Sequence, residues 1–340
     1  MTDKLIHNNF KFEGESNSKS SLLNRLKDKK DYYDFLISWF DKSDFIHANT
    51  SGSTGKPKKI KLKKTDLIAS AKLTAKYFNL NPGDRLINCL PIKYIAGKMM
   101  LVRALVLGLD IYLYPVNSTP LLNLKNDFDF VGLTPMQLEN SLKYIGKIKN
   151  VIVGGSAVNQ VLREKILSID SNVFETYGMT ETITHIAIKN LSKNQLEFTV
   201  LPGIKIYEKN NCLLIKPGHL SIDFVQTNDV VQLTSSNKFI LIGRKDFIIN
   251  SGGIKINPET VEQKLSKYYS SDFIISSLSN DKLGDEVVIV FKENIPENYK
   301  DAFKKLDKYE VPKKVFLLDT FPKNNGKINR IQIRNSINLN

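Results

Sequence analysis

Short apolar runs alternate with helical stretches between residues 85 and 178, and this alternation limits the fold more than any other feature of the chain. The runs lie at residues 85–90, 111–114, 130–133, 151–153 and 173–175. Residues 97–107 lie between the first two runs and have the composition of a largely buried helix. Strands that are separated by helices pair in parallel through crossover connections. We therefore predict an α/β fold with layers around a parallel sheet.

The pattern of apolar and turn-forming residues changes after residue 196. Short apolar runs at residues 204–207, 212–215, 230–233 and 239–242 are separated by Gly, Pro and Asn, which predicts a β-rich subdomain. A smaller unit with its own strands and helices begins near Asp246. With 340 residues the chain is long enough for two domains, and we predict them at residues 1–245 and 246–340. The polar residues 1–30 are predicted to form a loosely packed arm.

The net charge of +14 would suit a polyanionic partner, but the lysines are scattered and no nucleic-acid-binding module is recognisable. We expect no nucleic-acid partner; a small phosphorylated ligand would also profit from the positive field. The most apolar stretch, residues 99–114, is interrupted by Arg103 and Asp110 and is too short to span a bilayer. No membrane association is expected. Cys89 and Cys212 have no metal-ligand spacing and read as reduced thiols of a cytoplasmic protein.

Residues 50–59, with the sequence TSGSTGKPKK, combine glycines, hydroxyls and lysines in one loop. Glycine lets the backbone approach an anion, while hydroxyl and ammonium groups supply donors and charge. The spacing differs from that of a Walker A loop, because Gly52 and Gly55 are too close and Pro57 follows Lys56. The loop therefore indicates phosphate binding of another kind. By itself, it could also be a solvated Ser/Gly linker.

Four further segments follow in order. They are residues 154–157 (GGSA), residues 175–182 (ETYGMTET), residues 227–259 with TND, GRKD and SGGIKINPE, and residues 322–330 (PKNNGKINR). Together with the loop they resemble the adenylate-forming superfamily, which comprises acyl-CoA synthetases, aryl-CoA ligases and adenylation domains. The resemblance covers residues 46–332. It implies a large core domain and a small mobile C-terminal lid, in an N-terminally shortened form because the chain before the phosphate loop is short.

The resemblance implies an ATP site. The loop, through Thr50, Ser51, Gly52, Ser53, Thr54, Gly55 and Lys58, would hold the β- and γ-phosphates. The adenine would lie between Gly154, Gly155 and Ser156 on one face and Tyr177, next to Gly178, on the other. Thr180 would contact the α-phosphate, and Glu181 would bind Mg²⁺ together with phosphate oxygens. Asp229 would accept from the ribose hydroxyls, and Arg244 would donate to ribose or phosphate. Taken one by one, these residues also suit structural roles: a core aromatic, a helix-terminal acid, a strand-turn acid and a surface arginine.

Lys327 is the residue that the resemblance assigns to acyl-adenylate formation. It would bridge the attacking carboxylate and the α-phosphate, acting as an electrostatic clamp. Asp246 falls where the superfamily hinges its lid, which rotates after the first step to admit the thiol of coenzyme A. A solvated lysine in a C-terminal tail is the structural alternative for Lys327.

Arg103 is the best guide to the acid. A buried arginine is costly without an anion, which a protein carboxylate or a substrate carboxylate could supply. Residues 90–103 and 182–187 resemble the matching segments of o-succinylbenzoate–CoA ligases of menaquinone biosynthesis. This resemblance implies that Tyr94, Lys98, Arg103 and His185 contact a dicarboxylic acid. Lys93-Tyr94 replaces an aromatic-His pair that many relatives carry.

The predicted activity is ATP-dependent acid–CoA ligation, with 2-succinylbenzoate as the acid and ATP, Mg²⁺ and coenzyme A as the other participants. Two alternatives remain open from the sequence. One is another aryl- or acyl-CoA ligase, or an adenylation enzyme that loads a carrier protein. The other is a non-catalytic nucleotide-binding relative. The short N-terminal part leaves room for homodimer contacts.

Overall fold

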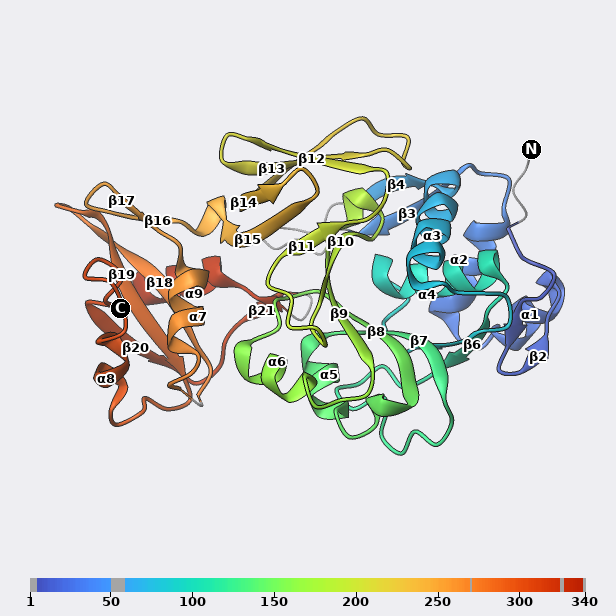
Figure 1. Cartoon of the computed structure of the whole chain (residues 1–340), viewed down its shortest axis with the longest axis horizontal. Coiled ribbons are helices and arrows are strands. Elements are labelled where there is room, and N and C mark those ends of the chain that lie inside the picture. Colours follow the sequence, from blue (N-terminus) through green and yellow to red (C-terminus); the bar gives the residue numbers. More distant parts are fainter. Residues whose placement is uncertain (1–4, 50–58, 270, 325–326, 339–340) are drawn as a thin grey trace.

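The computed structural model describes residues 5–49, 59–269, 271–324 and 327–338. Figure 1 shows two lobes side by side along the long axis. The larger lobe is built from the blue to yellow part of the chain, and the smaller lobe from the orange to red part. The two lobes carry separate sheets, so each is described in turn.

The core lobe is built on one hydrogen-bonded sheet that has 13 strands in the described residues. Their spatial order is β12-β13-β14-β15-β11-β10-β9-β8-β7-β5-β6-β1-β2. The bounds are β1 Lys11–Phe12, β2 Glu15–Ser16, β5 Arg85–Asn88, β6 Asp110–Leu113, β7 Phe128–Leu133, β8 Ile148–Val153, β9 Asn172–Gly178, β10 His185–Asn190, β11 Phe198–Val200, β12 Ile204–Lys209, β13 Cys212–Pro217, β14 Val225–Ser235 and β15 Lys238–Arg244. The pairs from β6 to β9 are parallel, and those from β9 to β15 are antiparallel. The predicted parallel layer and the β-rich part are both confirmed.

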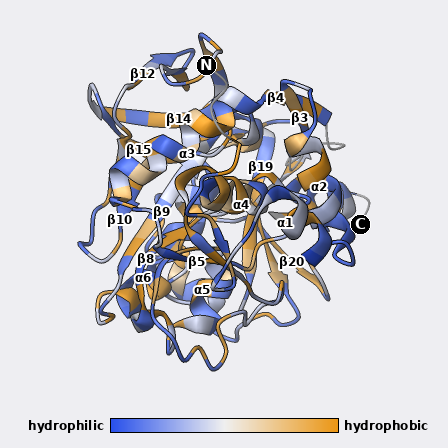
Figure 2. Ribbon diagram, turned by 90° about the vertical axis from the view of Figure 1, so that its right-hand side faces the viewer, coloured by the Kyte–Doolittle hydropathy of each residue, from blue (hydrophilic) through white to orange (hydrophobic). Residues whose placement is uncertain are grey.

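Helices cover both faces of this sheet. They are α1 Lys19–Arg25, α2 Lys30–Phe40, α3 Lys64–Phe78, α4 Ile95–Leu107, α5 Pro135–Ser141 and α6 Gln160–Ile166, and a separate hairpin joins β3 Phe45–Asn49 to β4 Lys59–Lys63. Helix α4 is buried almost throughout, and Figure 2 shows it as an apolar helix in the interior. Each fully buried Met, Leu or Val of α4 contributes about 1.5–3 kcal/mol. The helix ends at Gly108, whose φ of 74° suits glycine.

The N-terminal residues differ from the expectation of a loose arm. Phe10, Phe12, Leu22 and Leu26 are fully buried in the main apolar core. Strand β1 pairs in parallel with β6 and extends the sheet. The prediction was wrong because it weighed the average polarity of residues 1–30, whereas a few large apolar side chains are enough to anchor such a segment.

The C-terminal lobe contains a second sheet in the order β17-β16-β19-β18, with β20 paired to β19. Its elements are β16 Ile249–Ser251, β17 Ile254–Ile256, α7 Pro258–Leu265, β18 Phe273–Asn280, β19 Gly284–Lys292, α8 Tyr299–Phe303, β20 Lys314–Leu318, β21 Lys323–Asn324, β22 Lys327–Ile328 and α9 Arg330–Asn338. Two apolar clusters of its own fill this lobe. The hairpin β21–β22 extends from it toward the core lobe (Figure 1).

Candidate functional site

Glycines lie at the carboxyl ends of β8 and β9, where the backbone carries no side chain. Gly154 follows β8, and its N–H donates to Leu133 O at 3.1 Å. A Cβ at Gly154 would lie 2.7 Å from Oγ1 of Thr176, a hydroxyl that donates to Val153 O at 3.0 Å. A side chain is therefore excluded at this position. Ligands of α/β sheets bind beyond the carboxyl ends of the strands, so Gly154 lies where a ligand can approach the chain.

Tyr177 and Asp229 are brought together at this end of the sheet. The Tyr177 hydroxyl donates to Oδ2 of Asp229 at 2.5 Å, and the ring packs edge-on against Phe239. Burial, and then the charge of Asp229, raise the pKa of Tyr177 well above its ordinary value. The backbone N–H of Asp229 donates to the Thr227 hydroxyl, which in turn donates to Leu213 O. The Asp229 carboxylate is thus oriented by Tyr177 of β9, and the Asp229 backbone is fixed by Thr227 of its own strand.

Arg244 lies between two carboxylates. It faces Asp229 across the β14–β15 pair, with Nη1 at 3.6 Å from Oδ1. Its Nη2 contacts Oδ2 of Asp246 at 2.5 Å, and Asn228 Nδ2 donates to the other oxygen of Asp246 at 3.0 Å. Asp246 belongs to the 3-10 turn η3 (Lys245–Phe247), which links the two sheets. The predicted ribose residues and the predicted hinge residue therefore form one connected cluster.

A strained turn follows β9. Ile183 has φ 67° and ψ −55°, and Thr184 N donates to Thr182 O at 2.8 Å, so Ile183 is the centre of a γ-turn with positive φ. This conformation is rare for a β-branched residue and costs on the order of 1–3 kcal/mol. The Thr182 hydroxyl reinforces the turn by donating to Thr184 O at 2.9 Å. The turn fixes Thr184, while Glu181 on the preceding 3-10 turn η2 (Thr180–Thr182) is exposed.

Arg103 is buried in α4, with 1% of its surface exposed. Its Nη2 donates to the Thr184 hydroxyl at 3.1 Å, and its Nη1 contacts Sδ of Met100 at 3.4 Å. Its Nε has no partner in the described part of the chain, where no carboxylate forms an ion pair with the guanidinium either. Burial lowers the pKa of Arg103 to about 9. An uncompensated buried charge costs several kcal/mol, so the site favours an added anion.

His185 lies beside the pair formed by Arg103 and Thr184. The Thr184 hydroxyl lies 3.3 Å from Nδ1 of His185, and the Thr74 hydroxyl lies 3.4 Å from Nε2. Burial, and then the charge of Arg103, lower the pKa of His185 well below its ordinary value. The ring is therefore neutral at pH 7, beside a cation.

Lys98 lies apart from Arg103. Its Nζ donates to Ile92 O at 2.7 Å and sits 5.2 Å from the ring centre of Phe35 on α2. Burial lowers the pKa of Lys98. Five residues correspond to about 140° around a helix, so Lys98 and Arg103 point to different sides of α4. Tyr94 is the N-cap residue of α4, with Nζ of Lys93 5.2 Å from its ring centre. Of the four predicted acid-binding residues, the structure joins Arg103 and His185 through Thr184.

Two predicted elements cannot be compared with the structure. Residues 50–58, the predicted phosphate loop, lie outside the described residues. The backbone of Lys327 pairs with Asn324 in the β21–β22 hairpin, but its side chain also lies outside them. Ser156 and Gly155 are exposed beyond β8, Gly178 is exposed at the end of β9, and Thr180 is buried beside it.

A buried charge cluster that was not predicted from the sequence lies under the glycine turn. Oε2 of Glu175 on β9 is 3.0 Å from Nη2 of Arg163 and 2.8 Å from Nζ of Lys189. Its Oε1 accepts from Val158 N at 3.4 Å, which ties the segment after Gly154 to the sheet. A carboxylate inside an apolar strand is the signal that could have revealed the cluster.

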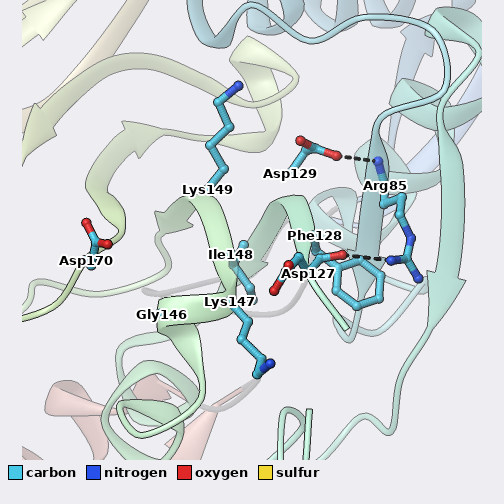
Figure 3. A pocket seen from close by; sticks show the side chains of 9 residues that line it. All are labelled: Arg85, Asp127, Phe128, Asp129, Gly146, Lys147, Ile148, Lys149 and Asp170. Atoms are coloured by element: carbon cyan, nitrogen blue, oxygen red, sulfur yellow. Dashed lines mark hydrogen bonds between the residues drawn. The ribbon is translucent and has the colours of Figure 1, made fainter. Parts of the chain in front are cut away.

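A cavity of about 510 Å³ lies at the opposite edge of the sheet, at the amino ends of β5, β7 and β8 (Figure 3). Arg85 there donates from its backbone N–H to Asp129 Oδ2 at 2.8 Å and from Nη1 to Asp127 O at 2.9 Å. Lys147 donates to Lys125 O at 3.0 Å. The cavity is separated by the length of the strands from Gly154 and Gly178, so it is not the candidate site.

The described residues contain no cluster of three His, Cys, Asp or Glu side chains suited to a metal ion. They also contain no helix that is both long and apolar enough to cross a bilayer.

Comparison with known proteins agrees with this geometry. The model of the AMP-binding enzyme family matches residues 40–207. A solved structure from Dyadobacter fermentans, described as an acyl-CoA synthetase (AMP-forming)/AMP-acid ligase II-like protein, is 34% identical, with 90% of this chain and 93% of that chain covered and a TM-score of 0.59. The chain belongs to the AMP-binding enzyme family. It is an AMP-forming acid–CoA ligase, as predicted.

Other relatives are more distant. The 2-succinylbenzoate–CoA ligase of Listeria monocytogenes is 24% identical over 321 residues, covering 84% of this chain and 68% of the relative. The enzyme of the same name from Bacillus cereus is 25% identical, with 82% and 67% covered. The chain thus spans about two thirds of their length. The o-succinylbenzoate coenzyme A synthetase of Bacillus subtilis, solved with ATP and magnesium ion, has a TM-score of 0.76 at 20% identity, covering 93% of this chain and 82% of that one. This likeness confirms the adenylate-forming fold.

Proposed function

We propose that this ligase activates 2-succinylbenzoate and transfers it to coenzyme A, a step of menaquinone biosynthesis in the cytoplasm. The observation that carries the proposal is Arg103, a buried cation with no carboxylate partner among the described residues. The carboxylate on the benzene ring would supply the missing charge, while the succinyl carboxylate reacts. The names of the relatives at 24% and 25% identity support the same acid.

In the first step, an oxygen of the succinyl carboxylate attacks the α-phosphorus of ATP and expels pyrophosphate. We propose that the loop at residues 50–58 holds the leaving phosphates and that Thr180 contacts the α-phosphate. Gly154, Gly155 and Ser156 would line one face of the adenine, with Tyr177 and Gly178 at the other. Asp229 and Arg244 would bind the ribose, which suits the fixed orientation of the Asp229 carboxylate.

Glu181 fits the role proposed for it at a magnesium ion. It is an exposed carboxylate, and the described residues group no three metal-binding side chains around it, so oxygens of the nucleotide would complete the coordination. A bound magnesium ion would neutralise charge on the phosphates and so favour attack by a carboxylate. Glu181 itself would orient the phosphate end of ATP beside Thr180.

In the second step, the sulfur of coenzyme A attacks the carbonyl of the adenylate and expels AMP. We propose that residues 246–340 are a lid that delivers Lys327 for the first step and rotates about Asp246 for the second. The cluster of Arg244, Asp246 and Asn228 at the start of the lid supports this boundary, because its contacts are polar and partly exposed. A homodimer is also proposed, to be checked by the mass in solution.

Release of pyrophosphate tests the proposal. We expect release to require ATP, Mg²⁺ and 2-succinylbenzoate; activity with other aryl acids but none with this one would show that the acid is wrong. A holo carrier protein in place of free coenzyme A tests the acceptor. Replacing Lys327 with Ala should lower the rate of adenylation about 100-fold because a charge clamp is lost. The matched variant Lys323→Ala, on the same hairpin, should stay within about twofold. Equal rates in both variants would remove the role given to Lys327.

A further inference from the structure

Two cations contact one buried carboxylate next to the segments proposed to hold the adenine. Glu175 on β9 is 5% exposed and Lys189 on β10 is 6% exposed. They face each other across the β9–β10 pair, with Nζ of Lys189 2.8 Å from Oε2 of Glu175. Nη2 of Arg163 on α6 lies 3.0 Å from the same oxygen. Buried ion pairs add little stability compared with apolar side chains, so stability alone does not account for this cluster.

On one side, Glu175 holds the segment that follows β8. Its Oε1 accepts from the backbone N–H of Val158 at 3.4 Å. Arg163, which contacts its other oxygen, belongs to α6, the helix that begins two residues after Val158. Both oxygens of the carboxylate therefore fix the path of residues 154–158 relative to β9.

On the other side, the cluster leads to Tyr177. Alternate residues of a strand share a face, so Tyr177 and Glu175 lie on the same face of β9. Nζ of Lys189 sits 4.4 Å from the ring centre of Phe198. The Phe198 ring stacks on Phe239 with 5.4 Å between the centroids, and the Tyr177 ring packs against both, at 5.9 and 5.2 Å. Lys189 thus supports the pair of rings on which Tyr177 rests.

We propose that Glu175 is a positioning residue for the nucleotide, which sets the spacing between the two walls of the adenine site without contacting the ligand. The inference rests on the proposed function for the location of the adenine between residues 154–156 and Tyr177. One carboxylate is linked to both walls, through Arg163 to the first and through Lys189 to the second. A gap of about 0.5–1 Å already forfeits a quarter to a half of the energy of a contact, so a stacked base is sensitive to this spacing.

The test compares the binding of ATP with that of CTP, whose base has a smaller stacking face. The readout is the ratio of the Kd for CTP to the Kd for ATP, measured by calorimetry with Mg²⁺ and without any acid. The stoichiometry of the titration reports the fraction of folded protein, so a loss of stability alone leaves the ratio unchanged. We expect Glu175→Met to lower the ratio about tenfold, or about 1.4 kcal/mol. Glu175→Gln keeps an oxygen acceptor at the same reach and should retain more of the ratio.

Asp110→Asn is the matched control. Asp110 is another buried carboxylate of the same sheet, at the first residue of β6. It accepts from the backbone N–H of Gly14 at 2.9 Å and from the Tyr112 hydroxyl at 3.0 Å, away from both walls of the adenine site. Its conversion to an amide should leave the ratio at the wild-type value.

Two variants break the links one at a time. Arg163→Met frees the first wall and Lys189→Met the second, and each should lower the ratio less than Glu175→Met. If Glu175→Met does not fold, the double variant Glu175→Met/Lys189→Met replaces a whole buried ion pair, a change that proteins tolerate better than the loss of one partner. The ratio in the double variant then decides.

Tyr177→Leu separates the possible failures. A lower ratio in Tyr177→Leu with an unchanged ratio in the folded Glu175 variant would overturn the role of Glu175 and leave the adenine site intact. A fall in Asp110→Asn as large as that in the Glu175 variant would also overturn it. An unchanged ratio in both Tyr177→Leu and the Glu175 variant, or a wild-type enzyme without preference for ATP, would overturn the location of the adenine and the inference with it. A different acid substrate would not affect the result, because no acid is present.

Discussion

Two arginines, one in each lobe, have little exposed surface but differ in the partners that their guanidinium groups contact. Arg330 at the start of α9 forms a two-pronged pair with Glu262 of α7, with nitrogen–oxygen distances of 2.8 and 2.5 Å, and it also donates to Ile275 O. Arg103 in α4 is more deeply buried and has a hydroxyl and a thioether sulfur as its partners. The counter-ion, rather than burial, separates a structural arginine from one that awaits a ligand.

The two arginines also connect different elements of the fold. Arg330 is the second residue after the β21–β22 hairpin and ties it to α7 and β18, so its ion pair anchors the segment that carries Lys327. Arg103 ties α4 to the γ-turn after β9 through Thr184. Removal of the first should therefore act on stability, and removal of the second on recognition of the acid.

The largest expected effect is on the paired arginine. Arg330→Met leaves the half-buried Glu262 carboxylate without its cation, and we expect the free energy of unfolding of the C-terminal lobe to fall by about 2–3 kcal/mol. Urea unfolding measures the change. Arg334→Met is the matched control, because its pair with Asp285 is 43% exposed on the arginine side and should contribute less than about 1 kcal/mol. Equal losses in the two variants would contradict the structural role of Arg330.

Replacing Arg103, which has no carboxylate partner among the described residues, should lower activity rather than stability. Arg103→Met removes the cation facing the ring carboxylate, and we expect kcat/KM for 2-succinylbenzoate to fall about 100-fold, or about 2.7 kcal/mol, with the KM for ATP unchanged. The free energy of unfolding should stay the same or rise, because an uncompensated buried charge is gone. A stability loss as large as that of Arg330→Met would show that Arg103 has a protein counter-ion after all.

The smallest effect concerns pH. Because the pKa of His185 in the folded protein is well below that of the unfolded chain, the unfolded chain binds a proton below about pH 6.5 while the folded protein does not. Stability should therefore fall as the pH falls through this range, by up to about 1.4 kcal/mol per pH unit. Unfolding at pH 7.5 and 5.5 measures this. His185→Gln should flatten the dependence, Arg103→Met should weaken it, and Arg330→Met should leave it unchanged.

The sequence predicted what depends on local pattern. The apolar runs that end at Gly154 and Gly178 indicated parallel strands, and the fold places both glycines at carboxyl ends of the sheet. The separation of Lys98 from Arg103 also follows from helix geometry and could have been predicted. The link from Arg103 to Thr184 spans 81 residues, and the hydrogen bonds from Ser221 to Asp66 join residues 155 apart. Such contacts leave no signal in a single sequence.

The γ-turn at Ile183 has a consequence for how this enzyme can evolve. The hydroxyl that joins Arg103 to His185 lies on a strained turn, and the hydrogen bonds and packing around the turn must offset that strain. A glycine at this position would adopt the same dihedral angles without strain, but it would also remove the Ile183 side chain, which is buried in the main apolar core. Relief of strain and loss of packing therefore oppose each other at Ile183, so a lineage that loosens this turn to change its acid must recover the lost stability elsewhere.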